Sequence, residues 1–132
     1  MWFVSVDKTR AFQGIELGTE LAKTPASSGI RLICMVDDET EVTDHEDVFW
    51  TVLNNIDPER DCRILEGATG AVLVMDGTRK IKEEGFTRNW PDKITMPDDI
   101  VALVDAKWER YGLGKKLKSP TGGRGAKNRI SR

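Results

Sequence analysis

The chain is poor in the residues that build metal centres and nucleophilic sites. It contains one histidine, His45, and two cysteines, Cys34 and Cys62, which do not form a Cys-x-x-Cys pair. Structural zinc sites use four cysteine or histidine ligands, so a His/Cys metal cluster is nearly excluded. Each cysteine stands in an apolar, strand-like context, which favours buried, reduced thiols in a cytosolic protein.

Long apolar runs are also missing. No stretch approaches the roughly 20 apolar residues of a membrane-spanning helix, and the start, MWFVSVDKTR, lacks the basic and apolar segments of a secretory signal. We therefore expect a cytoplasmic protein with no membrane partner. Its 132 residues, 39% hydrophobic and 32% charged, predict a globular domain that can bury its own core.

Acidic residues are absent from the last 18 positions, which carry seven basic ones. The rest of the chain has 13 basic and 22 acidic residues, a net charge of −9. The end is also rich in glycine and poor in apolar residues, so we predict one domain over residues 1–114 and a flexible, disordered basic tail over residues 115–132. Docking of this tail on an acidic partner is an alternative. Nucleic-acid binding is not favoured, because no aromatic residue is interleaved with the basic ones.

Strand and helix patterns alternate along the body of the chain. Apolar, β-branched runs predict strands, and apolar residues at helical spacing predict the segments between them. The run IRLICMV is apolar throughout, as in a parallel strand buried on both faces. The fold class is therefore α/β, a small sheet with parallel βαβ units and flanking helices. The expected strands are 2–6, 30–36, 61–65 and 71–75, and the expected helices begin near 11, 43 and 97.

Capping signals define two of the helices. Thr43 and Glu46 have the spacing of a capping box, in which each side chain satisfies a free backbone amide. Pro97 opens the last helix and Gly112 is expected to end it. The buried side of that helix is predicted to consist of Ile100, Val101, Leu103, Val104, Trp108 and Tyr111.

Candidate chemistry is sparse. Asp37 and Asp38 follow a buried strand, where ligands bind in open α/β sheets, and paired carboxylates there could hold Mg²⁺. A solvated strand end is the favoured interpretation, and His45 reads as a surface residue of a helix start. No Gly-rich phosphate loop and no Ser/His/Asp triad is present. We therefore expect no catalysis by this chain alone.

Five segments, in order, resemble one family. Val36-Asp37 begins the run VDDETEVTDHEDVFWTVLNNIDPERD, which is similar to the C-terminal domain of UbiD-type decarboxylases. The opening WFVSVDK followed by Phe12-Gln13-Gly14, the segment MDGTRK, and the ending with Arg88, Trp90 and a late Trp108 resemble the same domain. Gly77 stands where the family usually has alanine, and Asn55 stands where arginine is frequent. The loop between Asp61 and Met75 is shorter than is usual in the family.

The resemblance implies a family that decarboxylates or carboxylates aromatic and α,β-unsaturated acids with prenylated FMN. It also implies that the catalytic Glu-Arg-Glu set and the flavin and metal site belong to a larger N-terminal part. The C-terminal domain mainly builds the oligomer. Prenylated FMN and a divalent metal are thus expected in a partner chain, with no cofactor in this one.

From this resemblance we expect a non-catalytic small subunit of a UbiD-like aromatic acid (de)carboxylase complex, which supports oligomer assembly. Its partners would be a UbiD-like catalytic chain, a second copy, or both. The residues expected at the interface are Lys80, Arg88, Trp90, Trp108 and Tyr111. Three alternatives stay open: an excised oligomerisation domain of a full-length decarboxylase, a free-standing α/β domain that binds a metal or anion, and an RNA-binding accessory protein.

Overall fold

The computed structural model describes residues 1–67, 69–91, 94 and 96–114. The chain divides into two compact units, Met1–Trp90 and Pro91–Arg132. The predicted domain of residues 1–114 therefore spans both units, and the predicted tail lies outside the described residues.

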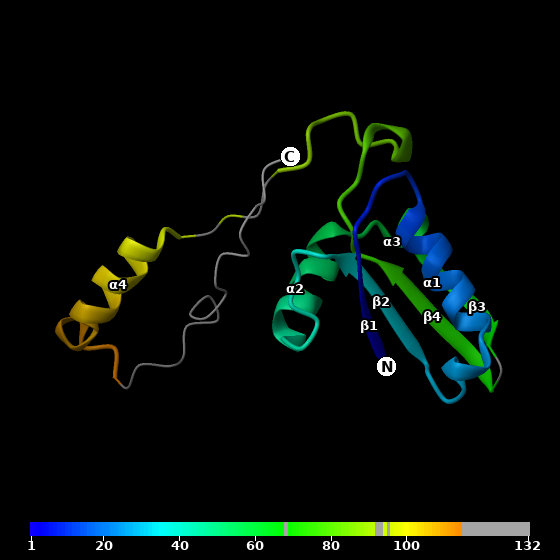
Figure 1. Cartoon of the computed structure of the whole chain (residues 1–132), viewed down its shortest axis with the longest axis horizontal. Coiled ribbons are helices and arrows are strands. Elements are labelled where there is room, and N and C mark those ends of the chain that lie inside the picture. Colours follow the sequence, from blue (N-terminus) through cyan, green and yellow to red (C-terminus); the bar gives the residue numbers. More distant parts are fainter. Residues whose placement is uncertain (68, 92–93, 95, 115–132) are drawn as a thin grey trace. The chain divides into compact units, whose positions relative to one another are not determined.

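A four-stranded sheet forms the centre of the first unit (Figure 1). Its order is β1-β2-β4-β3, with β1 at Trp2–Val6, β2 at Leu32–Asp37, β4 at Gly70–Asp76 and β3 at Cys62–Gly67. β1, β2 and β4 run parallel, and β3 pairs antiparallel with β4 as an edge hairpin. This confirms the predicted α/β class with a parallel βαβ unit, and it adds an antiparallel edge.

Helix α1, Gln13–Lys23, covers one face of the sheet. It packs against β2, β3 and β4, because its apolar residues recur on one side of the helix. The core beneath it is made by Ile15, Ala22, Ile33, Met35, Val72 and Val74. All six are buried, so this face of the sheet is closed.

Helix α2, His45–Asn55, packs on the opposite face, mainly against β2. Val48 and Val52 join Cys34 and Val36 in a second core that is separate from the first. The central strand β2 is therefore buried on both faces, as its continuous apolar run predicts. On the same side, the Phe3 ring makes edge contacts with the rings of His45 and Phe49.

Most predicted elements are confirmed, with shifts at their ends. β2 starts two residues later than expected and extends to Asp37, which pairs with Val6 of β1. The predicted cap of α2 is off by one residue. Asp44, not Thr43, is the N-cap and accepts a hydrogen bond from the Asp47 amide at 3.1 Å, whereas the Thr43 hydroxyl donates to Glu41. Asp and Thr both suit a cap, so local sequence does not separate them.

Both cysteines are free thiols, Cys34 buried and Cys62 half-buried. Burial, followed by the neighbouring Cys62, raises the pKa of the Cys34 thiol to about 11. At neutral pH this thiol is therefore protonated and a poor nucleophile. None of the helices in the described residues has the length and hydrophobicity that crossing a bilayer requires.

The second unit contains α4, Asp98–Lys107, continued by a short 3-10 helix, Trp108–Tyr111. Gly112 ends this segment in the left-handed region, with φ of 65°, as predicted. No residue of α4 or of the 3-10 helix is buried. The predicted buried side is therefore not found in the described residues of this unit, where Leu103 and Val104 are exposed and Trp108 is half-buried.

Candidate functional site

Charged side chains gather where the parallel strands end. β1, β2 and β4 all finish at the same edge of the sheet, and polar residues follow each of them. Six of the polar residues at this edge are buried: Lys8, Asp61, Asp76, Thr78, Lys80 and Glu84. Ligands of open α/β proteins bind at this edge. These six residues, here called the strand-end cluster, are therefore the first candidate for a catalytic or binding site.

The first half of the strand-end cluster is an ion pair between Lys8 and Glu84. Lys8 Nζ donates to both oxygens of the Glu84 carboxylate, at 2.6 and 2.8 Å, and also to the Arg79 carbonyl at 2.6 Å. Its fourth contact is the Thr78 hydroxyl at 3.2 Å. Glu84 also accepts from the backbone amides of Phe12 and Ile81, both at 2.9 Å. All of these hydrogen bonds lie within the chain, so neither side chain is free to bind a ligand.

The second half centres on Lys80. Its Nζ donates to the Asp76 carbonyl at 2.8 Å and lies 3.3 Å from Asp61 Oδ1 and 3.4 Å from Asp76 Oδ1. The Lys80 side chain is 0% exposed. Arg60 supplies a second cation to Asp61 through two hydrogen bonds, at 2.7 and 2.8 Å. Two cations, the buried Lys80 and the half-buried Arg60, therefore balance the two carboxylates.

Asp76 connects this group to helix α1. Its Oδ2 accepts the Ile15 amide at 2.8 Å, and its Oδ1 accepts the amide and hydroxyl of Thr78 at 3.0 and 2.5 Å. A carboxylate at the start of a helix satisfies free amides and complements the helix dipole. A Cβ atom at Gly14 would come within 2.6 Å of Asp76 Cγ, so the approach requires glycine at that position.

The pKa shifts follow from these contacts. Burial alone would raise the pKa of Glu84, but hydrogen bonds from Lys8 and from two backbone amides hold it below its ordinary value. For Asp61, burial is likewise outweighed, first by the hydrogen bonds from Arg60, so its pKa is also lowered. Both groups are carboxylates at neutral pH and accept rather than donate protons. A general acid, whose pKa must be raised towards neutrality, is therefore not found at either position.

The candidate metal ligands Asp37 and Asp38 do not form a cluster with other ligands. Asp37 Oδ2 accepts the Arg79 amide at 2.6 Å, and burial raises the pKa of this carboxyl in spite of that bond. Asp38 is exposed to solvent. Across the described ranges, no group of three His, Cys, Asp or Glu side chains could hold a metal ion.

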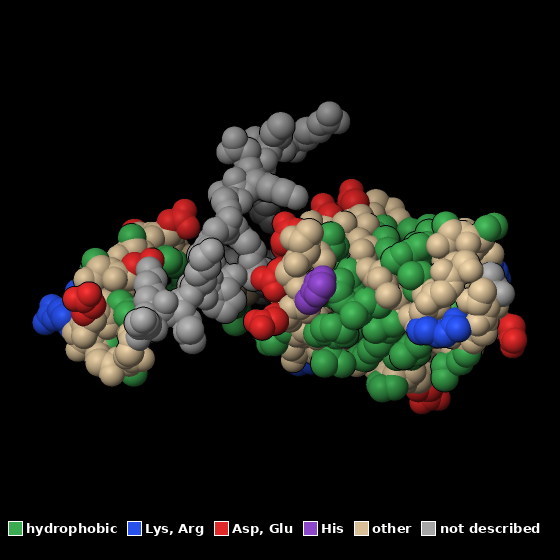
Figure 2. Space-filling view, turned by 90° about the horizontal axis from the view of Figure 1, so that it is seen from below, with side chains coloured by type: hydrophobic (Ala, Val, Ile, Leu, Met, Phe, Trp, Pro, Cys, Tyr) green, Lys and Arg blue, Asp and Glu red, His purple; other side chains and the backbone are tan. Residues whose placement is uncertain are grey.

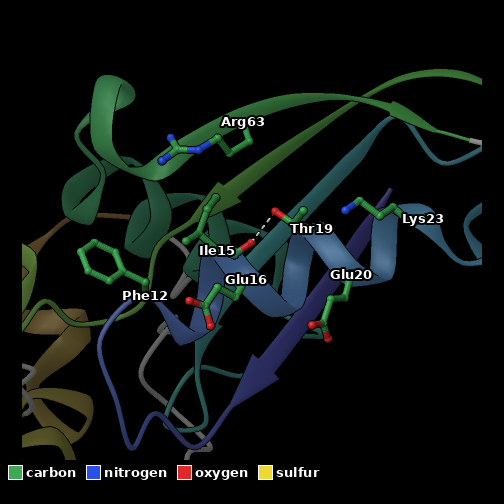
Figure 3. A pocket seen from close by; sticks show the side chains of 7 residues that line it. All are labelled: Phe12, Ile15, Glu16, Thr19, Glu20, Lys23 and Arg63. Carbon is green, nitrogen blue, oxygen red and sulfur yellow. Dashed lines mark hydrogen bonds between the residues drawn. The ribbon is translucent and has the colours of Figure 1, made fainter.

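A shallow hollow of about 410 Å³ lies beside α1 (Figure 3). Glu16 and Glu20 extend from the helix, and Arg63 reaches over from β3 on the other side. The Arg63 guanidinium donates to the backbone carbonyls of Glu59, Arg60 and Cys62, at 2.8 to 3.3 Å. Its task is therefore to satisfy the end of the short helix α3, Pro58–Asp61. The hollow offers charges of both signs but no paired acid and base.

Gly77 marks an unusually close contact between strand end and helix. A Cβ atom there would lie 2.8 Å from Val52 Cα and 3.2 Å from the Met35 carbonyl oxygen. The Gly77 amide donates to that same carbonyl at 2.8 Å, and its own carbonyl accepts from Asn55 of α2 at 2.8 Å. An alanine at this position would not fit at this spacing without a shift of α2.

Substitution Gly77→Ala should therefore lower the free energy of unfolding by about 1 to 3 kcal/mol, the usual cost of overpacking. Chemical denaturation monitored by circular dichroism measures this directly. The matched control is Ala71→Gly, at an exposed position of β4. This substitution should change the free energy of unfolding by less than about 1 kcal/mol. An unchanged midpoint for Gly77→Ala would show that α2 moves away at no cost.

The predicted interface residues lie in different environments. Lys80 is buried in the strand-end cluster, so its side chain contacts its own chain and we no longer expect it to reach a partner. Arg88 is exposed, and its guanidinium lies over the Phe86 ring at 5.7 Å. Trp90 is half-buried against the same ring, with a centroid distance of 4.7 Å. Trp108 and Tyr111 belong to the second unit, where Tyr111 is 47% exposed.

Comparison with known families identifies the first unit. The sequence profile of the 3-octaprenyl-4-hydroxybenzoate carboxy-lyase C-terminal domain, UbiD_C, matches residues 1–85. The chain belongs to this UbiD family. The match covers the whole sheet, both covering helices and the strand-end cluster up to Glu84, so these features are part of the UbiD C-terminal domain.

Relatives of known sequence are much longer than this chain. An uncharacterized protein of Aquifex aeolicus is 34% identical over 123 residues, which is 84% of this chain and 25% of that protein. One from Aeropyrum pernix is 32% identical over 126 residues, 86% of this chain and 26% of that protein. The chain therefore spans about a quarter of the length of these two relatives.

Solved structures share the fold at low sequence identity. Vanillic acid decarboxylase of Sedimentibacter hydroxybenzoicus in an open form matches 83% of this chain and 26% of its own, with a TM-score of 0.64 and 16% identity. The UbiD-class enzyme HmfF of Pelotomaculum thermopropionicum, solved as an evolved dimeric form with prFMN, matches 72% of this chain and 20% of its own, with a TM-score of 0.58 and 21% identity.

Proposed function

We propose that this chain is a non-catalytic component of a UbiD-like aromatic acid (de)carboxylase, and that it supports assembly with a UbiD-like catalytic chain. Family membership and the shared fold support a role in this enzyme class. The chain matches only about a quarter of its relatives. Most of the residues that such an enzyme needs would therefore come from a partner.

The observation that carries this proposal is the closed state of the strand-end cluster. Active sites keep charged groups in an open cleft with perturbed protonation. Here Lys8 and Lys80 are each bound to carboxylates and carbonyls of the same chain, and both are at most 4% exposed. Such a cluster fixes the strand ends and the start of α1, which is the task of a scaffold.

Prenylated FMN and a divalent metal are proposed to bind in the catalytic chain. A flavin phosphate requires free cations or a row of backbone amides, and the described residues do not fit it. The two buried lysines are already paired, and the hollow beside α1 carries Glu16 and Glu20 next to its basic residues. Carboxylates at that place would repel a phosphate.

A surface for the catalytic chain is proposed at the loop after the cluster. Trp90 and Arg88 both contact Phe86 there, and all three are half-buried or exposed. Tryptophan and arginine are common interface anchors. Trp108 and Tyr111 of the second unit stay as further candidates.

A second candidate function differs only in covalent connection. The domain would then act as the oligomerisation domain of a full-length decarboxylase, as the match to a quarter of longer relatives favours. The same contacts would be used in both cases. A free-standing metal-binding domain has less support, since Asp37 is held by the Arg79 amide and Asp38 faces solvent.

Reconstitution tests the proposal. The purified chain should carry no flavin absorbance and show no decarboxylase activity, whereas mixing it with a UbiD-class catalytic chain that lacks this domain should give a stable complex with higher activity. Trp90→Ala should weaken the complex by about 10- to 30-fold, with Lys82→Ala as the exposed control. A flavin-loaded, active preparation of this chain alone would contradict the proposal.

A further inference from the structure

Three sulfur-containing side chains form a row across one face of the sheet. Met75 of β4 pairs with Cys34 of β2 on one side and with Cys62 of β3 on the other. Side chains at directly paired positions of neighbouring strands point to the same face. Cys34 and Met75 pack in the core beneath α2. The three side chains, here called the sulfur row, therefore lie on the α2 side of the sheet.

The sulfur row runs from the interior of the unit to its surface. Cys34 is 0% exposed, whereas Met75 and Cys62 are half-buried. Burial, and after it the charge of Cys62, raises the pKa of the Cys34 thiol to about 11. Cys34 therefore keeps its proton, and a ligand that comes from solvent reaches Cys62 and Met75 first.

Cys62 and Met75 have the spacing that two sulfur ligands of one ion need. The Cβ atoms of directly opposed residues in an antiparallel pair lie about 4.5–5.5 Å apart. Two sulfur atoms on opposite sides of an ion, each at about 2.3 Å from it, span about 4.6 Å. Methionine is unbranched and has three rotatable bonds, so Met75 can turn its sulfur towards Cys62. Cys34 is two strand spacings, about 10 Å, from Cys62, so one ion does not bind both thiols.

Sulfur ligands select the kind of ion. Thiolates and thioethers are soft ligands that suit Cu(I), whereas Mg²⁺ and Ca²⁺ are bound by oxygen ligands. Oxygen ligands for such a hard ion are not gathered in the part of the chain that the structure describes, where no three His, Cys, Asp or Glu side chains could hold a metal. A cysteine and a methionine side by side are a different ligand set, and it favours a soft ion.

The surroundings of the sulfur row favour an uncharged complex. Val48 and Val52 of α2 pack against Cys34 in the same core. Figure 2 shows that apolar side chains also spread over the surface next to His45, where α2 begins. Burial of net charge among apolar groups is costly. A monovalent cation bound to one thiolate and one thioether carries no net charge, whereas a divalent cation with the same two ligands stays positive.

We propose that Cys62 and Met75 bind a soft monovalent metal ion of the Cu(I) class. The thiol of Cys62 gives up its proton to solvent, and the ion forms one bond to the resulting thiolate and one to the Met75 thioether. Neither the ion nor a sulfur atom is oxidised or reduced in this step. Cys34, the buried thiol of the row, is not a ligand. This site is separate from the assembly role proposed above and does not depend on it.

Competition titration tests the site. The reduced, full-length chain is titrated with Cu(I) under anaerobic conditions against a chromogenic Cu(I) chelator, and the wild type should bind one equivalent. Cys62→Ser should weaken binding by about 100-fold or more, and Met75→Leu by about 10-fold or more. Leucine conserves most of the methionine volume, so circular dichroism should show an unchanged fold in this variant.

Two matched controls separate the site from sulfur chemistry in general. Cys34→Ala removes the other thiol of the row and should leave the affinity for Cu(I) unchanged. Met35→Leu removes a methionine that is buried beneath α1 on the opposite face of the sheet, and it should also have no effect. A wild type that binds no Cu(I), a Met75→Leu variant that binds as tightly as the wild type, or loss of binding in Cys34→Ala would each overturn the proposal.

X-ray absorption at the copper edge examines the ligands directly. The Cu(I)-loaded wild type should show two sulfur neighbours, and Met75→Leu should show one fewer. A single sulfur neighbour in the wild type would mean that Cys62 binds the ion without Met75, and the proposed pair would then be wrong.

Discussion

Substitution Lys80→Met should lower the free energy of unfolding by about 3 to 5 kcal/mol, the usual cost of leaving a buried charge without its partner. Methionine keeps most of the side-chain volume, so the change isolates the charge. Asp61 and Asp76, at most 5% exposed, would then face each other without the cation between them. Arg60 would still hold Asp61, so Asp76 would carry most of the cost.

Urea denaturation followed by circular dichroism measures this loss, with Lys82→Met as the matched control. Lys82 lies two residues away and is exposed, so its substitution should change stability by less than about 0.5 kcal/mol. Equal stability of the two variants would show that the Lys80 ammonium contributes nothing net. The double variant Lys80→Met with Asp76→Asn should recover part of the loss, because Asp76 is the carboxylate left without a cation while Arg60 still holds Asp61.

Substitution Glu84→Gln should have an effect of similar size, about 3 to 5 kcal/mol at neutral pH. Glutamine keeps the shape but removes the charge opposite Lys8, which is at most 4% exposed. It also presents an amide donor where two backbone amides and the Lys8 ammonium already donate. Thermal unfolding at pH 7, with the exposed neighbour Glu83→Gln as control, provides the comparison.

The pH dependence of this pair has a defined sign. The pKa of Glu84 in the folded chain is lowered from its ordinary value of 4.5. The stabilisation that the Glu84 carboxylate contributes is therefore complete above pH 4.5. It is lost as the pH falls through the lower pKa that Glu84 has in the folded chain. The difference in unfolding free energy between wild type and Glu84→Gln should narrow as the pH decreases below 4.5. A difference that stays constant down to pH 2 would contradict the assignment.

Much of the fold follows from local sequence. The apolar runs ending near Val6, Val36 and Met75 predicted three strands that pair in parallel, and apolar residues at helical spacing predicted a helix beginning near residue 43, where α2 begins at His45. These signals depend on periodicity, which burial imposes directly on the sequence. The predicted bounds of helices and strands were off by one or two residues. At such a boundary, a single cap residue or one further pair in the strand ladder decides where the element ends.

The strand-end cluster was not predicted, for a physical reason. Lys8, Lys80 and Glu84 stand in polar segments that read as solvated loops, and only folding brings Lys8 to Glu84, 76 positions away. One signal was available. Lys8 and Lys80 each come shortly after a parallel strand, and the carboxyl ends of such strands meet at one edge. An acidic residue that ends one of these strands, such as Asp76, could be expected to pair with a lysine at this edge. The partner of each lysine does not follow from local patterns.

The separation between Lys8 and Glu84 also has a consequence during synthesis. The ribosome releases Lys8 76 residues before Glu84, which at ~5–20 residues per second is an interval of about 4 to 15 seconds. Throughout that interval the first strand has no partner for its lysine, and the loop that will cover the sheet edge has not been made. The ion pair between Lys8 and Glu84 can therefore form only after residue 84 has been synthesised, so this edge of the sheet is the last part of the domain to be fixed.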